Sequence, residues 1–166
     1  MQLTHVLTLA AALGSLAACR KKAEPGRFED FIAPVGQIVP AACTAEADGR
    51  RFTLTGFASL PDTLSVEGDD SAVEFAEQPG GRALSLAVKI PADVRVQAVG
   101  AARIAPGFRA TRRELDPASF RVVTADGEAT ASERVTVTVQ LEVVKHFQTH
   151  QVTGCTVRFV SAVKAP

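Results

Sequence analysis

The stretch that decides the fold is ERVTVTVQLEVV, residues 133–144, in which apolar and polar side chains alternate. Its apolar members, Val135 and every second residue up to Val143, face one way, and its threonines, Gln140 and Glu142 face the other. Alternation with a period of two is typical of a strand that is buried on one face and solvated on the other. The stretch therefore predicts an all-β protein with an antiparallel sheet.

Similar alternation predicts strands elsewhere in the chain, at residues 51–60, 71–77, 82–90, 93–99, 120–124 and 155–163. Pro79-Gly80-Gly81 is a strong turn signal between two of these runs, which predicts a hairpin there. In the last run we expect Val157, Phe159 and Val163 to point inward. Helix signals are few: Thr111-Arg-Arg-Glu114 has the form of a capping box, but Pro117 limits any helix to a turn or two.

The order of these elements predicts a small five- to seven-stranded barrel. Three strands come first, then a long connection, then two strands, and Gly56 lies in the middle of the first strand, where it can mark a sharp bend. The segments 52–60 and 126–137 resemble the first and fourth strands of small OB-fold domains. That resemblance implies a five-stranded Greek-key barrel over residues 45–163. An immunoglobulin-like β-sandwich is the alternative, although its buried Trp is missing here.

The N-terminal part of the chain has a different character. Residues 6–18 form an apolar run of the length of a signal-peptide core, too short to span a bilayer. Its end, Leu16-Ala17-Ala18-Cys19, resembles the lipobox of bacterial lipoproteins. The resemblance implies a signal peptide over 1–18 and a lipid on Cys19. Since Arg20 rather than Asp follows, it also implies an outer-membrane lipoprotein facing the periplasm in a two-membrane cell. The alternative for residues 6–18 is a buried helix of the domain.

This interpretation divides the rest of the chain into a tether and a domain. Residues 19–41 are rich in charged residues and proline, and we expect a lipid-anchored tether with a short ordered patch at Phe28, Phe31 and Ile32. The β-domain is expected over 42–166. If Cys19 carries lipid, Cys43 and Cys155 remain as a pair, and exported chains usually bridge such pairs. Two unpaired thiols are the alternative.

Two clusters of candidate ligand-binding residues lie in expected loops. His146 and His150 have the spacing of a metal-binding pair, but they lie between two strands rather than on a helix, so two solvated histidines are the simpler interpretation. The acidic turn Glu67-Gly-Asp-Asp70 lacks the spacing of an EF-hand and is expected to be a solvated turn.

Four arginines, Arg103, Arg109, Arg112 and Arg113, are the candidate anion-binding group. They could face an anionic partner such as lipid headgroups or a phosphorylated polymer, or they could form an ordinary charged loop. The 18 basic and 18 acidic residues give no net charge, which argues against nucleic acid as a partner.

No nucleophile elbow, phosphate-binding loop or dinucleotide fingerprint is present in the sequence. We therefore expect a non-catalytic lipoprotein without a cofactor, whose β-domain binds another envelope component, protein or polymer. A small-ligand or metal-binding lipoprotein using the His146/His150 loop is the alternative, and an unrecognised hydrolase is the second.

Overall fold

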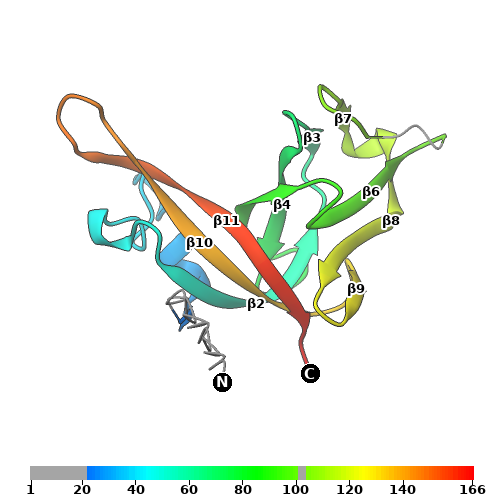
Figure 1. The fold of residues 1–166 in the computed structure, drawn as a ribbon, viewed down its shortest axis with the longest axis horizontal. Coiled ribbons are helices and arrows are strands. Elements are labelled where there is room, and N and C mark those ends of the chain that lie inside the picture. The colour runs from blue at the N-terminus through cyan, green and yellow to red at the C-terminus, as the bar shows by residue number, and fades with distance from the viewer. Residues whose placement is uncertain (1–21, 101–103) are drawn as a thin grey trace, which may run out of the picture.

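The structure is a computed structural model, and it describes residues 22–100 and 104–166. The described chain is all-β, with three short 3-10 helices (Figure 1). Five strands form a closed ring within one sheet: β2 (Arg51–Ser59), β4 (Asp70–Ala76), β5 (Ala83–Lys89), β11 (Val152–Lys164) and β10 (Val135–Lys145).

The ring has the order and directions expected of an OB-like barrel. Its neighbours run antiparallel except for β5 and β11, which are parallel and meet only at Leu86–Val157 and Ala87–Arg158. The predicted hairpin around Pro79 is the β4–β5 pair. Closure into a ring confirms the barrel-like architecture over the two-sheet sandwich.

Gly56 is the point at which β2 changes partner. Before it, residues 51–56 pair with β10; after it, residues 57–59 pair with β4. A Cβ atom at Gly56 would lie 2.2 Å from the carbonyl oxygen of Ala76, so only glycine allows the two strands to come this close. The bend predicted at this residue is therefore the feature that closes the ring.

The long connection between β5 and β10 forms a small sheet of its own. Its order is β6 (Val94–Ala98), β8 (Leu115–Thr124) and β9 (Gly127–Thr130). The capping box is present: the side chains of Thr111 and Glu114 cap η3 (Arg112–Glu114). The helix ends after one turn, because β8 begins at Leu115. Strand β8 is five residues longer at its start than the predicted 120–124, and Phe120 from it is buried in the core.

Two short strands pair outside the ring and were not predicted. They are β3 (Thr63–Ser65) and β7 (Arg109–Thr111), which lie at the upper right of Figure 1. At three residues each, they are too short for alternation to be recognised in the sequence.

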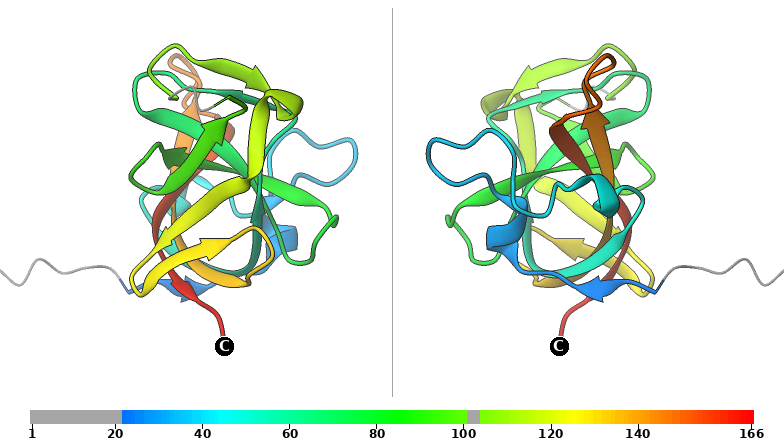
Figure 2. Two further views of the ribbon diagram at one scale, coloured as in Figure 1. Left: turned by 90° about the vertical axis from the view of Figure 1, so that its right-hand side faces the viewer. Right: turned by 90° about the vertical axis from the view of Figure 1, so that its left-hand side faces the viewer.

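The expected tether is partly folded. Strand β1 (Glu24–Pro25) pairs in parallel with β2, and η1 (Phe28–Phe31) buries both of its phenylalanines. Phe28 stacks on Phe75 and Phe31 meets Phe52 edge to face, so the ordered patch is part of the main core. The domain therefore begins near Glu24 rather than at residue 42, because these aromatic rings fill the core beside β2. The two views in Figure 2 show the β1–η1 segment on one side of the ring. The β6–β8–β9 sheet, which we call the inserted sheet, lies on the opposite side.

The last strand corrects one prediction. Val157 and Phe159 are buried, but Val163 is 46% exposed and Ala162 is buried in its place. A bulge causes the change: Ser161 pairs with Thr138 and Phe159 with Val139, which leaves Val160 as an extra residue. Beyond that residue, the inward and outward faces of β11 are exchanged.

Candidate functional site

The most prominent feature of the surface is the outer half of the β10–β11 hairpin, residues 142–156, which we call the arm. It continues past the last ring contacts, Gln140–Arg51 on β10 and Leu86–Val157 on β11, and projects at the upper left of Figure 1. Its two strands pair only with each other from Glu142–Thr156 to Lys145–Val152. A two-stranded ribbon with free edges is a ready platform for another chain.

The base of the arm is fixed to the domain. Cys43 and Cys155 form the predicted disulfide, with Cα atoms 5.7 Å apart and a separation of 112 positions in sequence. Beside it, the Val143 N–H donates to Oδ1 of Asp48 at 2.9 Å. The arm is thus held at its root, while its tip projects away from the ring (Figure 1).

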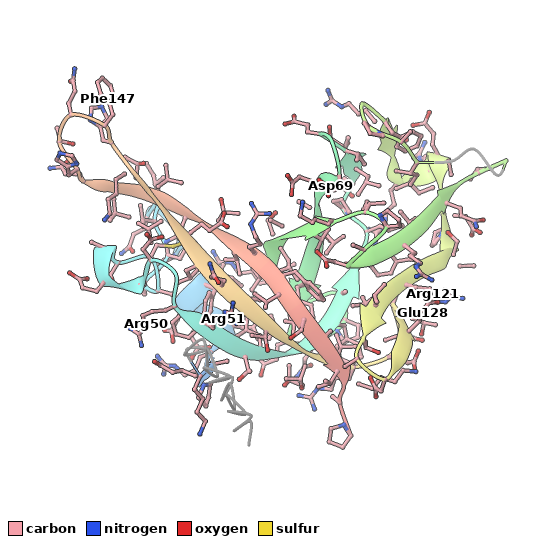
Figure 3. All side chains as sticks on the ribbon, in the orientation of Figure 1. Arg50, Arg51, Asp69, Arg121, Glu128 and Phe147 are labelled. Atoms are coloured by element: carbon pink, nitrogen blue, oxygen red, sulfur yellow. A yellow bond between two sulfur atoms is a disulfide. The ribbon has the colours of Figure 1, made fainter. Side chains whose placement is uncertain are left out.

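The tip carries an exposed aromatic ring. Phe147 is 79% exposed and points away from the molecule (Figure 3), and Val144, near the end of β10, is 51% exposed. The imidazole of His146 stacks on Phe147 with ring centres 5.2 Å apart. Exposed large apolar side chains that gather on a projecting hairpin are typical of an interaction site.

The two histidines of the tip shape the turn. His146 Nδ1 accepts the N–H groups of Gln148 and Thr149, both at 3.3 Å, and the carbonyl of His146 accepts the N–H of His150 at 2.8 Å. His150 has a φ of 55°, a left-handed conformation that closes the loop. One nitrogen of His146 is therefore engaged by the backbone. Within residues 22–100 and 104–166, no three His, Cys, Asp or Glu side chains come together as a metal site.

The acidic turn at residues 67–70 is part of an ion-pair network on the outer face of the ring. Arg158 on β11 binds Glu142 through two nitrogens, at 2.7 and 3.1 Å, and reaches Asp70 at 3.1 Å. Lys89 binds Asp69 at 2.9 Å. The network joins β10, β11, β5 and β4 across the seam where β5 and β11 share only two residue pairs.

The pKa values follow from these contacts. The hydrogen bonds to Glu142 raise the pKa of Arg158, and the Lys89 ammonium lowers the pKa of Asp69. Burial raises the pKa of Asp93, whose Oδ2 accepts the Lys89 N–H. Asp69 and Asp70 thus each form an ion pair with a cation of the chain itself.

Of the candidate arginines, Arg109 lies on β7 and Arg112 and Arg113 lie in η3, away from the arm (Figure 1). Arg109, Arg112 and Arg113 are all exposed, and Arg112 and Arg113 line a hollow of about 460 Å³ together with Asp62 and Thr111. Arg103 lies outside the described residues, as does Cys19. The structure places three of the four arginines, Arg109, Arg112 and Arg113, along β7 and η3, and we call them the arginine rim. They lie apart from the histidines of the arm tip.

A second apolar feature was not predicted from sequence. The loop at residues 33–40 exposes Val35 and Ile38 almost fully, at 98% and 88%. A turn closed by the Gln37 N–H on the Pro34 carbonyl holds the loop, with Gly36 at a φ of 83°. The flanking prolines were visible in the sequence, but proline indicates a turn without indicating what the turn exposes.

Comparison with known proteins gives no relative: no protein-family model, curated protein or solved structure matches this chain. In the part of the chain that the structure describes, no helix has the length and apolar character needed to cross a bilayer.

Proposed function

We propose that this chain is a lipid-anchored cell-envelope lipoprotein whose β-domain binds another envelope protein through the arm, without catalysis. Two features support the anchor. Residues 16–19 resemble a lipobox, and pairing of Cys43 with Cys155 leaves Cys19 as the one thiol outside the disulfide. The anchor is an outer-membrane one, with the domain in the periplasm, where a disulfide is expected to persist.

The exposed aromatic tip of the arm is the observation that carries the binding proposal. Phe147 and Val144 lie on a ribbon whose root is fixed by a disulfide, so the partner meets an ordered surface and little conformational freedom is lost on docking. Aromatic side chains that enter a pocket of the partner supply most of the energy of such interfaces. Free strand edges on the arm add a place for backbone hydrogen bonds.

The fold also determines how far the tip would stand from the membrane. Only residues 20–23 separate Cys19 from β1, and four residues span at most about 14 Å. Strand β1 lies beside Phe52, which pairs with Val139 on β10; from there the six residues to Lys145 extend about 20 Å. The anchor thus holds the domain close to the membrane, while the arm reaches outward.

Site-specific crosslinking in living cells tests the arm. A photoreactive amino acid at Gln148 should give a defined adduct, whereas the same residue at Glu128, on the inserted sheet, should give none. In the protein with the photoreactive amino acid at position 148, Phe147→Ser should abolish the adduct, while export and folding persist. No adduct at Gln148, or one that is indifferent to Phe147→Ser, contradicts binding through the arm.

Lipidation is tested separately. Labelled palmitate should enter the full chain, and Cys19→Ala should abolish the label and release the protein from membranes. Labelling that survives Cys19→Ala, or is absent from the original chain, contradicts the anchor but leaves the crosslinking result valid.

A further inference from the structure

The three arginines on β7 and η3 have neither a carboxylate partner nor a side-chain hydrogen bond, a state that only Arg134 shares among the other arginines of the described chain. Arg27, Arg50, Arg95 and Arg158 each form an ion pair with an Asp or Glu. In residues 22–100 and 104–166, no ion pair and no side-chain hydrogen bond involves Arg109, Arg112 or Arg113. Three guanidinium groups within five residues are thus left to solvent on a protein with no net charge.

The carboxylate nearest to the rim in sequence is engaged elsewhere. Glu114 Oε2 accepts both the N–H and the hydroxyl of Thr111, each at 2.8 Å, and these bonds lower its pKa. The capping box therefore keeps Glu114 ionised and oriented toward Thr111. Its geometry leaves the two arginines between them, Arg112 and Arg113, without an intramolecular partner.

The backbone of the rim is held on both sides. Strand β7 pairs with β3 from Arg109–Ser65 to Thr111–Thr63, and the Arg112 N–H donates to the Asp62 carbonyl at 2.9 Å. Ala110 is buried between Arg109 and Thr111, so these two side chains share the outward face of the strand. The arginines are long, but they start from fixed positions.

A hollow lies at two of these arginines, Arg112 and Arg113. Asp62, Thr111, Arg112 and Arg113 line a space of about 460 Å³, and Arg112 also borders a second one of about 200 Å³ between β2 and the β4–β5 turn. Arginine binds phosphate oxygens through two parallel N–H donors, which makes it the side chain best suited to a phosphate group. We propose that the rim of Arg109, Arg112 and Arg113 is a phosphate-binding site, distinct from the arm, that takes a phosphate ester of a surface or soluble polyanion.

Asp62 in the hollow disfavours a phosphate ligand, so replacing it should strengthen binding, whereas replacing the arginines should weaken it. Asp62 lines the same space as Arg112 and Arg113, yet it forms no ion pair with either among the described residues. Its carboxylate repels phosphate at short range. Replacement by Asn removes this repulsion and keeps the side chain's size.

Inorganic pyrophosphate is the soluble probe. Titration followed by nuclear magnetic resonance should shift the signals of Arg109–Arg113 saturably, with sulfate giving weaker shifts. Arg112→Gln with Arg113→Gln should weaken binding about tenfold or more, as expected for the loss of charge-assisted hydrogen bonds. Asp62→Asn should strengthen it. The matched control, Arg95→Gln with Arg121→Gln, removes the same charge from the inserted sheet and should leave binding unchanged.

Vesicles distinguish the source of the phosphate. Binding to phosphatidylglycerol vesicles, but not to phosphatidylcholine vesicles, that disappears in the Arg112→Gln/Arg113→Gln protein assigns the site to a lipid surface. Pyrophosphate binding without vesicle binding assigns it to a soluble or polymeric ester. If the control pair weakens binding as much as the rim pair, or if neither probe depends on the rim, the proposal is wrong. The arm's crosslinks are unaffected by either outcome.

Discussion

Replacing Gly56 by alanine should be the most damaging single-methyl change in the ring. The new Cβ would lie 2.2 Å from the Ala76 oxygen, 2.9 Å from the Ala76 carbonyl carbon and 2.9 Å from Cζ of Phe28. Carbon and oxygen normally approach no closer than about 3.3 Å, so the strands must separate by about 1 Å. Two of the three obstacles are backbone atoms, which no side-chain rotation can move.

The magnitude follows from what this separation breaks. Strands β2 and β4 are joined by only three residue pairs, Phe57–Ala76, Ala58–Phe75 and Ser59–Glu74. The loss of two backbone hydrogen bonds there costs about 2 kcal/mol. Displacement of Phe28 from its stack on Phe75 adds about 1 kcal/mol. The expected destabilisation is therefore about 3 kcal/mol, a large share of the stability of a domain of this size.

Urea unfolding measures this effect against a matched control. Gly154 is also within a strand, but a Cβ there would meet nothing within 4 Å. Gly154→Ala should be neutral or slightly stabilising, by about 0.5 kcal/mol. Gly56→Ala should lower the midpoint by about 2 M urea, for an m-value of about 1.5 kcal/mol/M. If the two variants unfold at the same urea concentration, β2 does not pass this close to β4 and the ring is not closed as described.

Three further measurements test other parts of the molecule. Cys43→Ser with Cys155→Ser should lower stability by about 5 kcal/mol in the chain-entropy model for a 112-residue separation, as read from denaturation with and without reductant. Phe147→Ser should leave the melting temperature within about 1 °C, because the ring is exposed, even though it should abolish the crosslink at Gln148. Glu133 has its pKa lowered to about 2, first by the Thr130 N–H. A carboxyl with a depressed pKa stabilises the fold above its unfolded pKa and loses this effect as the pH falls toward 2, so Glu133→Gln should flatten the acid side of the stability profile.

The long strands could be predicted because each carries its own pattern. The alternation at residues 133–144, at 51–60 and at 82–90 requires one buried face, whatever the partner strand is. Gly56 was also informative, since a glycine in the middle of such a pattern has a structural reason. The predicted order of three strands, a long connection and two more strands is compatible with few topologies other than the five-stranded ring.

The features that the sequence did not reveal depend on partners far away in the chain. Val160 looks like one more apolar residue of an alternating strand, and only the pairing of β11 with β10 makes it the bulge that turns Val163 outward. Likewise, the sequence predicted an ordered patch at Phe28 and Phe31, but their place in the main core depends on contacts with Phe75 and Phe52, which nothing within residues 24–32 indicates.

The arginine rim and the arm tip show that candidate functional sites also depend on residues far away in the chain. The sequence shows four arginines as a group, but whether an arginine can bind a ligand depends on whether nearby carboxylates already pair with it. Arg158, which the sequence did not indicate as a binding residue, is fully paired. Arg112 and Arg113 have no ion pair among the described residues, and the nearby Glu114 is held by Thr111. At the arm tip, the spacing of the histidines suggested a binding pair, whereas the exposed apolar group is Phe147, which lies between them in sequence. The signal available there is a large apolar residue in an otherwise polar turn, and the structure exposes that residue.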